Sequence, residues 1–105
     1  MFNINGEAWQ ILAVEPDSDT LRRENREFTV GVCDDSLRTI FVATGLPMLF
    51  LKKVLCHEIT HAAMFSYNVY LTLEQEELVA DLIATYGEEI IDITNQMFKK
   101  IKGDT

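Results

Sequence analysis

The hydrophobic pattern of this chain changes at Gly45-Leu46-Pro47, and this change most limits the folds open to it. In residues 28–33, apolar side chains alternate with polar or small ones, which is typical of a half-buried strand. In residues 51–62 they recur every three or four positions, which predicts one buried face of a helix. Strands followed by helices predict an α+β fold, and 105 residues without a linker predict a single domain over residues 1–105.

Short strands are expected in the first half of the chain. Asn5-Gly6 is a strong tight-turn dipeptide, and it precedes an apolar run at residues 9–14. The charged residues 20–27 are interpreted as a loop or a solvated helical turn. Asp34-Asp35-Ser36 forms a polar turn before the strand from Leu37 to Thr44, which favours an antiparallel hairpin. We therefore expect a small N-terminal antiparallel sheet of about three strands.

Two helices are expected after Pro47. The first extends to about residue 66. The second is long, follows a capping box at Thr72 and Gln75, and continues into lysines that complement the helix dipole. Gly87 lies inside this second pattern, which allows a kink or a split there. The apolar stripe of the second helix consists of Leu78, Leu82, Tyr86, Ile90, Ile93, Met97 and Ile101.

The charge balance is acidic, with a formal net charge of −8. The basic residues form no cluster of the kind that a nucleic-acid surface needs, so we expect no nucleic-acid partner. The longest apolar stretch is far shorter than the roughly 18 residues of a membrane span, and the first residues lack the basic and apolar segments of a signal peptide. We therefore expect no membrane partner, a cytoplasmic location, and reduced thiols at Cys33 and Cys56.

Both histidines of the chain lie in one pentapeptide, His57-Glu58-Ile59-Thr60-His61, on the first expected helix. Side chains four residues apart share a helical face, so the two imidazoles can converge on one metal ion. Glu58 follows the first of them and can take a proton from water bound to that metal. The alternative is a helix whose histidines make only ordinary hydrogen bonds.

A catalytic zinc site needs a third protein ligand and an open position, and no histidine remains to supply that ligand. Residues 74–81 offer several carboxylates at the start of the second helix. Glu77 and Asp81 share a face, so we expect Glu77 to bind the metal and Asp81 to accept the outer N–H of a ligand histidine. Glu74 is the alternative ligand. Favourable charge at a helix N-terminus otherwise explains Glu74 and Glu76.

The two motifs together resemble the gluzincin pattern H-E-x-x-H…E-x-x-x-D. The closest kind is the ImmA/IrrE-type metallopeptidases and small phage-encoded zincin-like proteins. Gly31-Val32-Cys33-Asp34 and Ile40-Phe41-Val42 occupy the places of the Gly-x-x-Asp step and the I-x-V-like strand found upstream in the latter. The resemblance covers residues 28–91, most of the chain.

This resemblance implies a minimal zincin-like domain in which His57, His61 and Glu77 hold Zn²⁺. Glu58 is implied as the general base of peptide-bond hydrolysis. The strand from Leu37 to Thr44 is implied to be the sheet edge to which an extended peptide or protein substrate adds.

Gluzincins often stabilise the oxyanion with a His or Tyr downstream of the metal-binding helix. No histidine is left here, so we expect Tyr70, which lies between the two helices, to take that role. Tyr67 and Tyr86 are the alternatives.

The expected function is that of a zinc-dependent metalloprotease, and two alternatives stay open. One is a catalytically inactive zincin-like module of phage or mobile-element origin that metal stabilises for binding, since few residues remain to build a deep cleft. The other is a plain α+β interaction protein without metal. The sequence predicts neither the substrate nor the oligomeric state.

Overall fold

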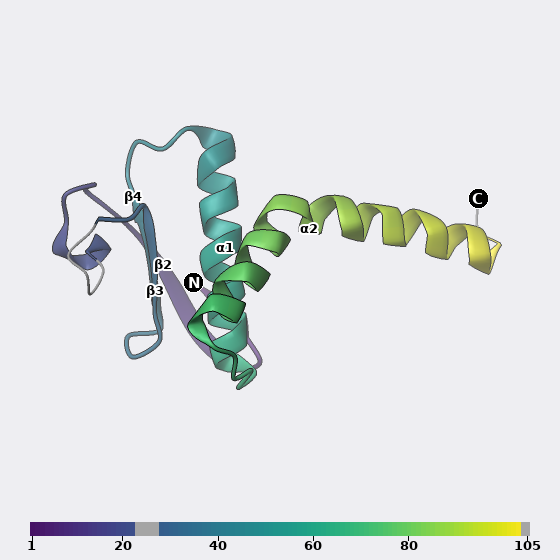
Figure 1. Cartoon of the computed structure of the whole chain (residues 1–105), viewed down its shortest axis with the longest axis horizontal. Coiled ribbons are helices and arrows are strands. Elements are labelled where there is room, and N and C mark those ends of the chain that lie inside the picture. The colour runs from purple at the N-terminus through teal and green to yellow at the C-terminus, as the bar shows by residue number, and fades with distance from the viewer. Residues whose placement is uncertain (23–27, 104–105) are drawn as a thin grey trace.

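A computed structural model describes residues 1–22 and 28–103. The chain forms a sheet followed by two helices, so the expected α+β class is confirmed (Figure 1). A 3₁₀ turn at Asp19–Leu21 begins the segment expected as a loop or helical turn, and residues 23–27 of that segment lie outside the described part. The elements are β1 (Phe2–Ile4), β2 (Glu7–Val14), β3 (Gly31–Asp34), β4 (Thr39–Ala43), α1 (Met48–Ser66) and α2 (Leu73–Lys102).

The sheet has four strands in the order β1-β2-β4-β3. The β1–β2 and β3–β4 pairs are antiparallel, as expected, whereas β2 and β4 are parallel. The sheet is therefore mixed, and it differs from the expected antiparallel sheet of about three strands. The reason is that the β3–β4 hairpin docks onto β2 through its second strand.

The position of β4 corrects the expected peptide-binding edge. We expected the strand from Leu37 to Thr44 to be a sheet edge, but β4 is hydrogen-bonded to β2 on one side and to β3 on the other. All five of its residues are buried. Its unbroken apolar run Ile40-Phe41-Val42 is typical of a central strand buried on both faces. Within the described sheet, β3 and not β4 is the edge strand on that side.

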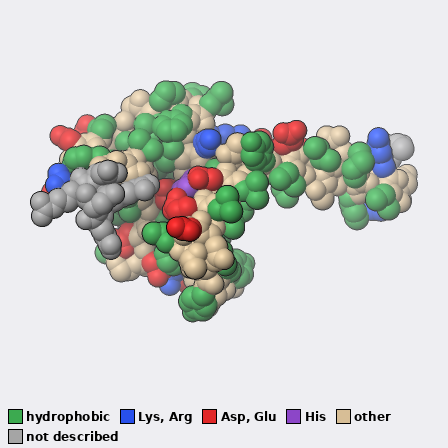
Figure 2. All heavy atoms as spheres, viewed as in Figure 1, with side chains coloured by type: hydrophobic (Ala, Val, Ile, Leu, Met, Phe, Trp, Pro, Cys, Tyr) green, Lys and Arg blue, Asp and Glu red, His purple; other side chains and the backbone are tan. Residues whose placement is uncertain are grey.

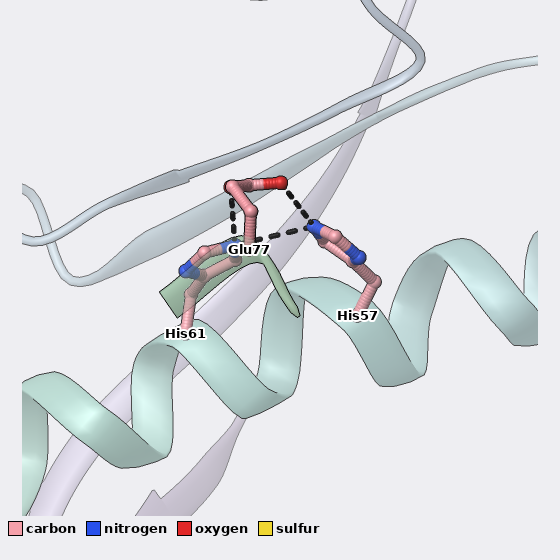
Figure 3. A group of neighbouring side chains, drawn as sticks. All are labelled: His57, His61 and Glu77. Atoms are coloured by element: carbon pink, nitrogen blue, oxygen red, sulfur yellow. Dashed lines mark hydrogen bonds and ion pairs between the residues drawn. The ribbon is translucent and has the colours of Figure 1, made fainter. Parts of the chain in front are cut away.

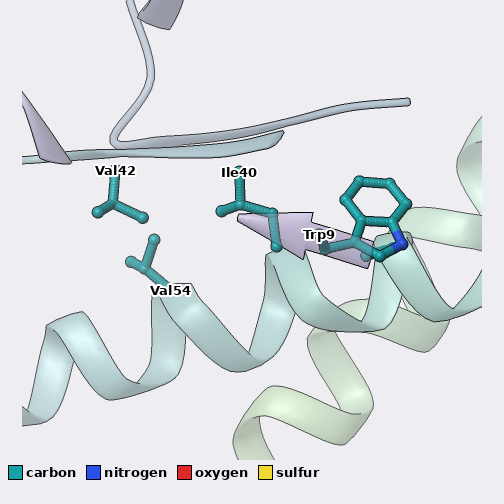
Figure 4. Close-up of a cluster of buried hydrophobic side chains, with 5 residues drawn as sticks. Trp9, Ile40, Val42 and Val54 are labelled. Atoms are coloured by element: carbon teal, nitrogen blue, oxygen red, sulfur yellow. The ribbon is translucent and has the colours of Figure 1, made fainter. Parts of the chain in front are cut away.

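The main core lies between the sheet and α1. Trp9 from β2, Ile40 and Val42 from β4, and Val54 from α1 meet there (Figure 4). The indole N–H of Trp9 donates to Ser66 Oγ over 2.8 Å, which ties the end of α1 to the sheet. A buried indole that keeps its hydrogen bond avoids the cost of an unpaired polar group.

The two helices have nearly the expected bounds. The Thr72 hydroxyl accepts from the Gln75 N–H while the Gln75 side chain accepts from the Thr72 N–H, so the expected capping box is present. α2 ends at Gly103, whose positive φ of 87° suits glycine. α2 is one continuous helix, so Gly87 does not split it, but its axis changes direction where it leaves α1 (Figure 1). In the described part of the chain, neither helix has the length and apolar character that crossing a membrane requires.

Candidate metal centre

Two histidines from α1 and one glutamate from α2 converge on one point (Figure 3). His57 and His61 lie one helical turn apart and face α2. Glu77 reaches both rings: its Oε2 lies 3.3 Å from His57 Nε2 and its Oε1 lies 2.9 Å from His61 Nε2. The two Nε2 atoms are 3.2 Å apart. The three residues expected as metal ligands are therefore in contact with one another.

A carboxylate holds the outer nitrogen of each ring. His57 Nδ1 lies 2.9 Å from Asp81 Oδ1, the contact expected for Asp81. His61 Nδ1 lies 2.6 Å from Glu76 Oε1. Because a carboxylate only accepts, each Nδ1 carries the donated proton, and in the neutral rings the lone pairs on Nε2 then point inward.

Glu76 is the site residue that sequence reasoning missed. We attributed it to favourable charge at the start of α2, but its side chain is only 17% exposed and contacts His61. A signal was available, because each metal-binding histidine needs an acceptor for its outer N–H. Two histidines need two acceptors, and only Asp81 had been assigned.

The donor set fits a zinc ion. Ligand atoms of a tetrahedral zinc site lie about 3.3 Å apart when the metal–ligand distances have their usual values. The two inner nitrogens lie 3.2 Å apart, and each lies 2.9–3.3 Å from one oxygen of Glu77. With both Nδ1 protons directed outward, these four atoms are all acceptors, and a cation among them removes their repulsion. Imidazole and carboxylate ligands together suit zinc.

Glu58 lies beside this cluster under the edge strand. It is buried, with 8% exposure. A Cβ atom on Gly31 would lie 3.0 Å from Glu58 Oε2 and 2.8 Å from Val54 Cγ1. Glycine at this position therefore lets β3 approach the Glu58 carboxylate closely.

Two adjoining surface cavities open on the cluster, with volumes of about 300 and 780 Å³. They share Gly31, His57, Glu58 and Glu77, whereas His61 lines only the larger one. Acidic side chains surround the visible histidine on this face of the molecule (Figure 2). The smaller cavity continues toward Phe50 and the larger one toward Phe65.

Cys33 lines the larger cavity and is not one of the clustered ligands. Burial raises the pKa of its thiol far above the usual range, and the negative charge of Glu58, followed by that of Asp35 and Glu76, raises it further. The thiol therefore stays protonated.

The structure does not bring Tyr70 or Glu74 to the cluster. Tyr70 is 88% exposed, and its hydroxyl donates to Asn68 Oδ1 over 3.4 Å in the connection between the helices. Glu74 is exposed at the start of α2, so it does not replace Glu77 as the third contact of the histidines. The alternatives Tyr67 and Tyr86 are also more than half exposed. No tyrosine of the described residues lines either cavity.

Comparison with known proteins finds no matching protein family, no similar curated protein and no similar solved structure. Arguments about function therefore depend on the geometry of the site itself.

Proposed function

We propose that this protein is a zinc-dependent metallopeptidase of the gluzincin type. The observation that carries the proposal is the convergence of His57, His61 and Glu77 beside a buried glutamate, Glu58. An ordinary pair of hydrogen-bonded histidines would not need three carboxylates around it, two of which hold the outer nitrogens. This is the arrangement that a metal-binding histidine pair requires.

Zinc held by these ligands would lower the pKa of a water molecule and polarise the scissile carbonyl. Glu58 accepts the proton of the attacking water, whose oxygen adds to the carbonyl carbon, and delivers it to the leaving nitrogen as the C–N bond breaks. Asp81 and Glu76 act through the histidines, because they fix the tautomer and the orientation of each ring.

An extended substrate would pair with β3. This strand ends the described sheet beside the cluster, and its first residue, Gly31, lines both cavities. A peptide hydrogen-bonded to β3 as an added strand would pass over Glu58 and His57. The peptide-binding edge that we assigned to the strand from Leu37 to Thr44 is therefore reassigned to Gly31–Asp34.

A second candidate is a metal-stabilised binding module without catalytic activity. It is favoured by the exposed position of Tyr70, since no tyrosine hydroxyl of the described residues reaches the cavities to stabilise an oxyanion. The metal would then hold α2 against α1, and β3 would bind a peptide without cleaving it.

The substitution Glu58→Gln separates these candidates. For a peptidase we expect about one zinc per chain in both the wild type and the variant, with cleavage of a fluorogenic peptide library falling by at least about 100-fold in the variant. Glu89→Gln removes the same charge from an exposed position on α2 and is the matched control. Cleavage that persists in Glu58→Gln contradicts the peptidase. A wild type that binds zinc and cleaves nothing favours the binding module, and a wild type that binds no zinc contradicts both.

A further inference from the structure

The second part of α2 extends beyond the rest of the described chain, and its apolar side chains are exposed. The Lys52 ammonium contacts the Glu88 carboxylate at 3.0 Å, and beyond this pair α2 projects away from the rest of the molecule (Figure 1). Every residue from 88 to 103 is exposed. We call residues 88–102 the α2 arm. An isolated helix of about 15 residues is marginally stable in water, so packing against another surface would stabilise the arm.

The exposed surface of the arm is strongly apolar. Ile90, Ile93, Met97 and Ile101 are spaced by three, four and four residues, which places them on one helical face. Their exposed fractions range from 42% to 88%. Ile91 and Phe98 lie beside this face and widen it, and their side chains are 58% and 59% exposed. Figure 2 shows such side chains along the projecting helix.

α2 packs on α1 without using this face. Ala80 is the only residue of α2 that is fully buried, and Ala84 and Gly87 are partly buried at spacings of four and three. Small side chains on this face allow the two helices to approach closely. The large side chains of the expected stripe are not buried against α1. Leu78, which belongs to the part of α2 that lies along α1, is 70% exposed.

The charges of the arm are divided along its length. Glu88, Glu89 and Asp92 lie in its first half, and its last turn carries a group of three lysines. An antiparallel pair of arms centred near residue 95 sets the acidic first half of each copy beside the lysine-bearing end of the other. A parallel pair would set like charges together, which is unfavourable.

We infer that the α2 arm is the interface of a two-fold symmetric homodimer in which two arms pack antiparallel. A two-fold axis requires a surface that is complementary to itself, and the divided charges meet this requirement. In this pairing Ile93 of each copy lies on Met97 of the other. The inference is independent of the proposed function, because no candidate ligand lies on the arm.

The area of the apolar face sets the expected affinity. Six large side chains that are about half exposed or more bury roughly 500–600 Å² per copy, which is near the lower limit for specific interfaces. We therefore expect a reversible dimer with a dissociation constant in the micromolar range.

Sedimentation of the full chain from about 1 µM to about 500 µM tests the inference. We expect a monomer–dimer equilibrium, and Ile93→Asp should raise its dissociation constant at least about 30-fold because a charge replaces a central apolar side chain. Asn95→Asp, on the polar face of the arm, is the matched control. The near-UV signal of Trp9, which is buried far from the arm, reports whether each variant is folded.

Three outcomes would overturn the inference: a wild type that stays monomeric throughout, a dimer that Ile93→Asp leaves intact, or growth beyond a dimer, as expected if an arm binds elsewhere on the next copy. Orientation is tested with Lys102→Cys in a background where Cys33 and Cys56 are replaced by alanine. Antiparallel arms hold the two new thiols about 20 Å apart along the axis, so no disulfide should form within the dimer. Efficient crosslinking would indicate parallel arms and would contradict the antiparallel packing.

Discussion

The two parts of α2 share one continuous backbone helix and differ in what their side chains contact. Residues 73–87 lie along α1 and bring Glu76, Glu77 and Asp81 to the histidines. The α2 arm carries Ile90, Ile93, Met97 and Ile101 on an exposed face, and its contact with α1 is the Lys52–Glu88 pair at its start. Hydrophobicity therefore does not decide which part of the helix packs on the domain. A small-residue face and a network of carboxylates around His57 and His61 hold the first part in place.

Chelation of the proposed zinc ion is expected to have the largest effect, because it should weaken the attachment of the first part of α2 to α1 and leave the arm unchanged. An ion that binds only the folded state contributes about 4 kcal/mol when its free concentration is 1,000 times its dissociation constant. For a domain of this size, its loss should lower the melting temperature by about 15 °C or more. Scanning calorimetry with and without a chelator measures the shift.

The arm provides the internal control for metal removal. Because it lies outside the cluster, the dimer dissociation constant of the chelated protein should stay within about twofold of the untreated value at 25 °C. A melting temperature that does not change with chelator would contradict a metal between α1 and the first part of α2.

A larger side chain at Ala80 is expected to have the next largest effect on the stability of the domain. Ala80 is fully buried, so Ala80→Leu should separate α2 from α1 and lower the free energy of unfolding by about 2 kcal/mol. Asn95→Leu adds a side chain of similar size on the exposed face of the arm and should change it by less than about 0.5 kcal/mol. Urea unfolding of the two variants at low protein concentration makes the comparison. If both variants lowered the free energy of unfolding equally, the two parts of α2 would not differ in how closely they pack on the domain.

The sequence predicted the local features of this molecule better than the distant ones. The bounds of α1, the capping box at Thr72 and the facing of His57 and His61 follow from spacing along one helix, which neighbouring residues determine. The order of the strands depends on pairing between distant segments, and the hairpin pattern of β4 did not indicate that β2 would pair with it. The unbroken apolar run of β4 was the signal that this strand lies in the centre of the sheet.

In the candidate site, too, local features were predicted and contacts between distant segments were missed. Glu77 and Asp81 were predicted because they share a helical face, and Glu76 was missed because its contact with His61 depends on how α2 crosses α1. Tyr70 was chosen for its position between two helices, but a residue in a connection is not constrained to point into the site. The apolar stripe of α2 predicted a helix correctly without indicating what covers it.

Glu76→Gln is expected to have the smallest effect, and it tests how α2 contributes to the site. Gln keeps an oxygen that can accept from His61 Nδ1 but loses the charge that strengthens this 2.6 Å contact. We expect zinc affinity, measured by competition with a chromophoric chelator, to fall about tenfold. Glu74→Gln removes the same charge from the same helical turn without touching a histidine, and it should change affinity by less than about twofold. If both variants weaken zinc binding equally, the first turn of α2 contributes only its general negative charge. A selective loss in Glu76→Gln would instead assign that contribution to the single hydrogen bond that fixes the His61 ring.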